Sequence, residues 1–170
     1  FRRYFRLRVG AERWIAVDAP PDLEDCRPFI RVAGLLSAGN VRVPRVWHAD
    51  TERGFMLLDD LGDVLLLDEV SGQPPGIAWQ HYSRALVELA EIAKLPCATL
   101  PAYDADLLNR EMALFVEWFA EGQLQLQLSR DERALLDRVM ARLVDSALAQ
   151  PTVFVHRDYH SRNLMVVDDG

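Results

Sequence analysis

The segment Val155-His156-Arg157-Asp158-Tyr159-His160-Ser161-Arg162-Asn163-Leu164 decides how the rest of this 170-residue sequence is interpreted. It lies between two short apolar runs, residues 152–155 and 164–167, which predict short β-strands. Four residues separate Asp158 from Asn163, so the backbone can turn and both side chains can face one cleft. The alternative is a strand-exit turn in which the two residues only cap the backbone, and the fixed spacing makes that the weaker explanation.

The order His-Arg-Asp followed by Asn five positions later matches the catalytic loop of kinases. In that loop the aspartate meets the substrate hydroxyl and accepts its proton, and the asparagine reaches a Mg²⁺ ion on the nucleotide phosphates. Asp158 is therefore the predicted catalytic residue and Asn163 the predicted metal ligand, with ATP and Mg²⁺ as cofactors. His156 is predicted to be structural, with its ring hydrogen-bonded to the backbone of the loop.

The same run resembles the catalytic loop of aminoglycoside phosphotransferases and choline kinases, in which a second histidine, here His160, is usual. Upstream, residues 54–62 (GFMLLDDLG) are similar to the last strand and hinge of the N-terminal lobe in that family. The backbone of that hinge pairs with adenine. The resemblance therefore implies a nucleotide site at Asp59, Asp60 and Leu61.

Three further stretches resemble the anomeric sugar kinases that phosphorylate N-acetylmuramate and N-acetylglucosamine in bacterial cell-wall recycling. They are FRRYFR at 1–6, DAPP at 18–21, and LLNREM at 107–112 with Phe115 and Trp118. The resemblance implies ATP-dependent transfer of the γ-phosphoryl group to the anomeric hydroxyl of such an amino sugar. An aminoglycoside, choline or homoserine is the alternative acceptor.

A helix expected at residues 104–122 carries Glu111 and Trp118, which are seven residues apart and so share one α-helical face. A ring and a carboxylate on one face suit a sugar, because the ring stacks on its C–H surface and the carboxylate accepts from its hydroxyls. The alternative is an amphipathic helix with Trp118 in the core and Glu111 in solvent.

Hydrophobic patterning predicts the order β-β-α-β-β in the first sixty residues and helices thereafter. The expected elements are a hairpin at 3–18, a helix at 26–38 ending at Gly39, strands at 45–49 and 54–58, and helices at 77–94, 104–122 and 129–148. Asp104 is the expected cap of the second of these last three helices, and Ser129 with Glu132 forms a capping box at the start of the third.

These elements predict an α+β, two-lobed protein-kinase-like fold, with a small antiparallel-sheet N-lobe at 1–60 and a helical C-lobe at 61–170 that holds the catalytic loop, 156–163. We expect it to be truncated at both ends. The sequence begins inside a hairpin and stops at Asp168-Asp169-Gly170, which reads as a turn. The second metal-binding aspartate is expected beyond residue 170.

Two features of the kinase pattern are absent from the sequence. The second strand runs into Asp18 where kinases carry a phosphate-binding lysine, and no G-x-G-x-x-G motif is present. Arg6 or Arg8 on the neighbouring strand would supply the missing charge, or they are solvated strand-edge arginines; Glu24 could hold such an arginine. The absent lysine keeps open a second class of function, a nucleotide-binding pseudokinase without turnover.

Composition limits the classes of partner that this protein can have. The net charge of −7 argues against a nucleic-acid partner. The sequence contains no apolar run of 18 residues, so it predicts no membrane span. Cys26 and Cys97 lack metal-ligand spacing and are expected to be free thiols. No secretion signal is visible. We therefore expect a cytoplasmic protein whose partner is a small molecule, an amino sugar.

Overall fold

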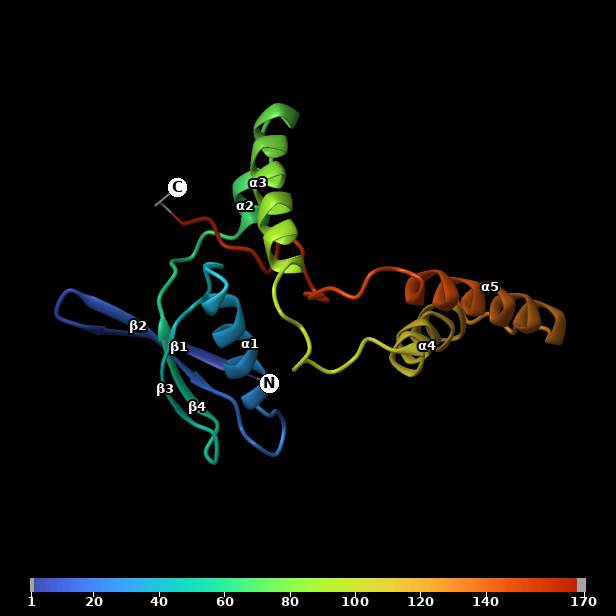
Figure 1. Ribbon diagram of the computed structural model, residues 1–170, viewed down its shortest axis with the longest axis horizontal. Helices are drawn as coiled ribbons and strands as arrows, with labels where there is room; N and C mark the ends of the chain where they lie inside the picture. The colour runs from blue at the N-terminus through green and yellow to red at the C-terminus, as the bar shows by residue number, and fades with distance from the viewer. Residues whose placement is uncertain (1, 168–170) are drawn as a thin grey trace. The chain divides into compact units, whose positions relative to one another are not determined.

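The computed structural model describes residues 2–167 and has an α+β fold (Figure 1). The chain forms two compact units. One comprises Phe1–Pro96 with Val153–Gly170, and the other comprises Cys97–Thr152. The first unit contains the sheet, three helices and the catalytic loop, and the second contains the remaining helices.

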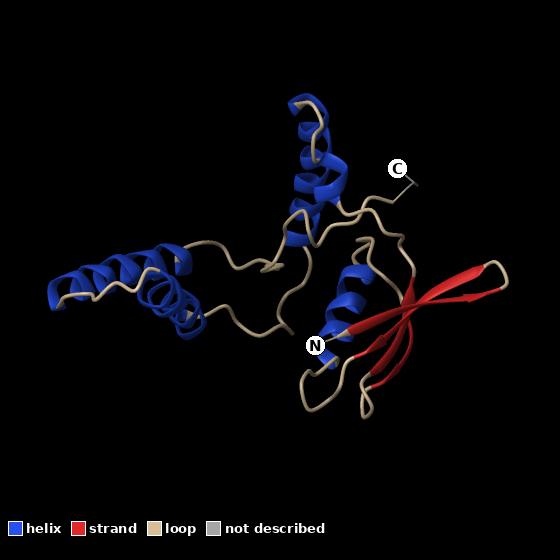
Figure 2. Cartoon of the chain, turned by 180° about the vertical axis from the view of Figure 1, so that it is seen from behind, coloured by secondary structure: helices blue, strands red, loops and turns tan. Residues whose placement is uncertain are grey.

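The first unit is built on a four-stranded antiparallel sheet. Its strands are β1 (Arg3–Val9), β2 (Glu12–Asp18), β3 (Val46–Asp50) and β4 (Phe55–Asp59). They lie in the order β1-β2-β4-β3. Figure 2 shows the strands in red. Arg3 lies opposite Asp18, and Val17 lies opposite Met56. The small antiparallel sheet and the hairpin predicted from the sequence are confirmed.

The helices follow the predicted order with one difference in geometry. The first unit contains α1 (Arg27–Ala38), α2 (Leu66–Val70) and α3 (Pro75–Ala93). The second contains α4 (Ala105–Leu114), the π-helix η1 (Phe115–Gln123) and α5 (Arg130–Leu148). The Asp104 cap and the capping box of Ser129 with Glu132 are both present. The helix expected at 104–122 is therefore α-helical only in its first half.

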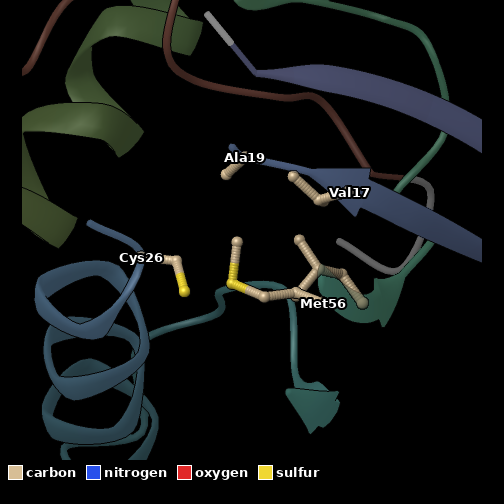
Figure 3. Packing of buried hydrophobic residues seen from close by; sticks show 5 residues of the cluster. Val17, Ala19, Cys26 and Met56 are labelled. Atoms are coloured by element: carbon tan, nitrogen blue, oxygen red, sulfur yellow. The ribbon is translucent and has the colours of Figure 1, made fainter. Parts of the chain in front are cut away.

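The core of the first unit lies between the sheet and α1. Five residues form this core: Val17 of β2, Ala19 just after β2, Met56 and Leu58 of β4, and Cys26 just before α1. Figure 3 shows four of these side chains converging. Each large apolar side chain buried in this way stabilises the fold by about 1.5–3 kcal/mol. This packing also fixes both ends of the loop between Ala19 and Cys26, which carries Glu24.

The C-terminal end of α1 differs from the expectation. Gly39 has a φ of −85°, and the left-handed residue is Asn40, with a φ of 61°. The Val41 N–H donates to the Leu36 carbonyl at 2.9 Å, and the Asn40 N–H donates to the Ser37 carbonyl at 3.0 Å. This is a Schellman motif with asparagine in the left-handed position.

Gly54 should be the position in the sheet most sensitive to a single methyl group. Its φ is 75°, and an added Cβ would lie 1.8 Å from the carbonyl oxygen of Ala19. We expect Gly54→Ala in the full-length protein to cost about 3 kcal/mol or more of unfolding free energy, measured by urea denaturation. Gly10→Ala is the control, because Gly10 has a φ of 63° but no atom within 4 Å of an added Cβ. It should cost about 1 kcal/mol, and equal losses at the two positions would contradict the steric argument.

The two strands expected around the catalytic loop are not formed. Residues 152–155 are not in a strand, and Met165 makes a single antiparallel bridge to Leu65. The Leu66 N–H donates to the Leu164 carbonyl at 2.8 Å, and the Val166 N–H donates to the Val64 carbonyl at 2.9 Å. The segment after the loop thus pairs with residues that precede α2, and the prediction of two strands around the loop is wrong. The predicted turn at 168–170 lies outside the described residues.

Candidate active site

The catalytic loop is anchored to α2 and α3. The N–H of Leu67, in α2, donates to the Ser161 carbonyl at 3.0 Å, and the Tyr159 hydroxyl donates to the carbonyl of Ala85, in α3, at 2.7 Å. Just before the loop, Phe154 is buried. Arg157 has a φ of 72°, a conformation that non-glycine residues adopt rarely and that clusters at functional sites. The loop is therefore held after Asp158 by two hydrogen bonds and before it by the buried Phe154.

Asp158 and Asn163 are in direct contact. Asn163 Nδ2 donates to Asp158 Oδ2 at 2.6 Å and to the Asp158 carbonyl oxygen at 3.0 Å. The side chain of Asp158 is 70% exposed, so its carboxylate can reach an acceptor molecule. The five-residue spacing thus brings together the two side chains that the sequence predicts to act together.

His160 completes this cluster. Its Nε2 lies 2.9 Å from Asp158 Oδ1, and its Nδ1 accepts a hydrogen bond from the Arg162 N–H at 3.2 Å. Because Nδ1 accepts, Nε2 carries a proton and donates to Asp158. His160 therefore contacts one carboxylate oxygen and Asn163 the other, with His160 Nε2 lying 3.3 Å from Asn163 Nδ2. In the sequence, its only signal is the resemblance of the loop to the aminoglycoside phosphotransferases.

The amide of Asn163 suits a hard cation. With Nδ2 committed to Asp158, Oδ1 points away from that carboxylate, and amide oxygens are ligands that Mg²⁺ accepts. The described residues contain no group of three or more His, Cys, Asp and Glu that could hold a metal by themselves. Magnesium commonly binds through one or two protein oxygens together with substrate phosphates, so Asn163 fits the expected ion.

His156 packs against the loop through its ring. It lies edge-on to Tyr159, with centroids 5.2 Å apart and planes at 83°. Burial lowers the pKa of His156, more than the nearby Asp158 charge raises it, so the ring is neutral near pH 7. Its buried Nδ1 has no hydrogen-bond partner among residues 2–167. The backbone hydrogen bond expected for this ring is not observed at that nitrogen.

Arg6 is bound by the hinge. Its guanidinium donates to Asp60 at 2.7 and 3.0 Å, to Asp63 at 2.7 and 2.8 Å, and to the Gly62 carbonyl at 3.2 Å. These contacts raise the pKa of Arg6, through Asp63 first and Asp60 second, and lower the pKa of both carboxyl groups. Arg13 also lowers the pKa of both carboxyl groups through its charge, so two cations and two carboxylates lie together here. Arg6 therefore ties β1 to the hinge with its donors committed to these carboxylates, and its phosphate-binding role stays a prediction.

The other hinge residues differ in what their side chains do. The Asp59 carboxylate accepts from Trp47 Nε1 at 2.6 Å and from the Arg45 N–H at 3.0 Å. The side chain of Leu61 is partly exposed. The Asp59 and Asp60 side chains thus stabilise the hinge, and any contact with adenine falls to the backbone.

The predicted sugar-binding pair lies in the second unit. Glu111 is in α4 and exposed, and Trp118 is in η1 and 67% exposed. Trp118 is therefore not a core residue of this unit. In a π-helix the hydrogen bonds span five residues, so the chain turns less at each residue than in an α-helix. The α-helical spacing that placed the two side chains on one face does not hold here.

A small antiparallel sheet with one covering helix, a hinge, and an Asp–Asn catalytic loop is consistent with a kinase-like phosphotransferase. The chain matches the phosphotransferase enzyme family over residues 1–170 and belongs to that family. It is 47% identical over 167 residues to the N-acetylmuramate/N-acetylglucosamine kinase of Pseudomonas aeruginosa, covering 98% of this chain and 48% of that protein.

Two other relatives carry the same name. The Pseudomonas putida protein is 44% identical over 97% of this chain and 48% of its own length. The Neisseria meningitidis protein is 37% identical over 98% of this chain and 50% of its own length. The chain thus spans about half the length of the curated relatives it matches. Among the described residues, no helix is long and apolar enough to cross a membrane.

Proposed function

We propose that the full-length protein transfers the γ-phosphoryl group of ATP to the anomeric hydroxyl of N-acetylmuramate or N-acetylglucosamine. The observation that carries the proposal is the contact of Asp158 with both Asn163 and His160 in a loop of the phosphotransferase family. The names of the relatives support the choice of acceptor.

Each loop residue has a defined role in this reaction. Asp158 orients the sugar hydroxyl and accepts its proton while the hydroxyl oxygen bonds to phosphorus and ADP leaves. His160 and Asn163 fix the Asp158 carboxylate by contacting its two oxygens. Asn163 Oδ1 would hold Mg²⁺, which neutralises charge on the phosphates. Most of the rate enhancement then comes from positioning and electrostatics.

The proposal also covers the layout and setting of the protein. Residues 1–60 form the nucleotide-binding lobe, and residues 61–170 belong to the helical lobe of a two-lobed kinase-like fold. The backbone at Asp59, Asp60 and Leu61 pairs with adenine, and Glu111 and Trp118 contact the sugar. The protein acts in the cytoplasm on a small molecule.

A panel of acceptors at equal concentration tests the function. With full-length protein and MgATP, we expect phosphorylation of both N-acetyl sugars, and the product should release phosphate in mild acid, to which anomeric phosphates are labile. Trp118→Ala should raise the KM for the sugar about tenfold without changing the KM for ATP, because only stacking on the sugar is lost. Trp79→Ala is the matched control, since Trp79 is 66% exposed in α3.

Three outcomes count against parts of the proposal. Transfer to an aminoglycoside, choline or homoserine, with none to the N-acetyl sugars, refutes the acceptor. ATP binding without transfer to any alcohol indicates a pseudokinase. An equal rise in the sugar KM for Trp79→Ala and Trp118→Ala excludes a specific role for Trp118.

A further inference from the structure

Arg2 lies where β1, the end of β2 and the start of α1 meet. It immediately precedes β1, whose first residue Arg3 pairs with Asp18 at the end of β2. Tyr4 pairs with the buried Val17, and Arg2 is two residues before Tyr4, so Arg2 faces the same side of the hairpin as the core. Its guanidinium lies 5.2 Å from the ring centroid of Phe29, in the first turn of α1.

The guanidinium is held but not saturated. One Arg2 terminal nitrogen lies 2.6 Å from Glu24 Oε1, and the side chains are 22% and 30% exposed. Arg2 Nε is buried without a hydrogen-bond partner among residues 2–167. Buried donors are nearly always satisfied, because an unmade hydrogen bond costs about 1–3 kcal/mol. Nε is inaccessible, but the side chain is 22% exposed, so a terminal N–H that does not face Glu24 remains for an oxyanion.

No lysine of this chain can fill that role. Lys94 is the only lysine in the sequence, and it closes α3, paired with Glu91 at 2.5 Å. Kinases hold the α- and β-phosphates with a strand lysine, which a glutamate at the neighbouring helix fixes in place. Arg2 with Glu24 carries the same balance of one cation and one carboxylate. Arg6 instead donates to two carboxylates, Asp60 and Asp63.

We propose that Arg2, oriented by Glu24 and stacked on Phe29, is the cation that binds the α- and β-phosphates of the nucleotide. This inference rests on the proposed function. The planar guanidinium presents several N–H donors in a fixed fork that matches phosphate oxygens. The contact with Glu24 keeps the fork in one orientation before the nucleotide arrives, so little side-chain entropy is lost on binding.

The test compares ligands with and without phosphates. In calorimetric titrations of full-length protein with Mg²⁺, Arg2→Ala should weaken binding of a non-hydrolysable ATP analogue about 10- to 100-fold. Adenosine, which has no phosphates, should bind with unchanged affinity. Arg2→Lys should retain part of the affinity for the ATP analogue. Glu24→Gln should cause a smaller loss, because the cation remains but is no longer oriented.

Arg3→Ala is the matched control, since Arg3 is adjacent, more exposed and paired with Asp18. It should bind both ligands as the wild type does. Unchanged binding of the ATP analogue by Arg2→Ala overturns the inference. Equal losses for the analogue and adenosine also overturn it, because they indicate a role in folding. If the wild type binds the ATP analogue but phosphorylates no sugar, the proposed acceptor fails while the Arg2 comparison remains decisive.

Discussion

Asp158→Asn in the full-length protein should lower kcat at least about a hundredfold and leave the affinity for ATP nearly unchanged. An amide cannot accept the proton of the sugar hydroxyl. The replacement keeps the size of the side chain and an oxygen that can still accept from Asn163 Nδ2. The loss should therefore fall on the chemical step, measured by steady-state kinetics at saturating sugar and ATP.

Asp145→Asn is the control, because Asp145 is an exposed carboxylate near the end of α5. It should retain wild-type kcat. Near wild-type turnover in Asp158→Asn would exclude Asp158 as the catalytic base. A large loss of ATP affinity in that variant would instead place Asp158 on the nucleotide.

The catalytic pair was predictable because its information is local. Asp158 and Asn163 are five residues apart, and the turn between them is short enough for spacing alone to bring the side chains together. The same holds for the capping box of Ser129 with Glu132 and for the hairpin that joins β1 to β2. In each case the interacting residues are close in sequence, so backbone geometry leaves few alternatives.

The contacts that the sequence did not reveal join distant residues. Arg6 contacts Asp60 and Asp63, which are 54 and 57 positions away. Arg2, before the hairpin, contacts Glu24, which follows it in the sequence. A surface pattern of charges does not show which carboxylate each arginine will meet. The partner depends on the order of strands in the sheet and on the packing of α1 against it.

The errors made from the sequence also arise from competition between local and tertiary structure. The apolar run before the catalytic loop, residues 152–155, has strand-like residues but forms no strand, and in the run after the loop Met165 makes a single bridge to Leu65. The residues of η1 have the spacing of an α-helix, but Phe115–Gln123 forms a π-helix. Periodicity distinguishes buried from exposed positions and does not by itself select the partner strand or the hydrogen-bond span.

Asn163→Ala in the full-length protein should raise the Mg²⁺ concentration needed for half-maximal activity about tenfold or more. The substitution removes Oδ1, the proposed metal ligand, together with the Nδ2 contact to Asp158. Asn163→Asp separates the two effects, because it keeps an oxygen for the ion and replaces the donor by a charge that repels Asp158. That variant should need no more Mg²⁺ than the wild type but should still lose kcat.

The measurement is a Mg²⁺ titration of initial rates at a fixed, saturating ATP concentration for the wild type and each variant. Ser161→Ala is the control, because Ser161 contributes its carbonyl to the Leu67 N–H and the substitution keeps that carbonyl. Its Mg²⁺ dependence should match the wild type. If Asn163→Ala titrates with Mg²⁺ as the wild type does, Asn163 only orients Asp158, and the ion is bound by ligands outside this loop.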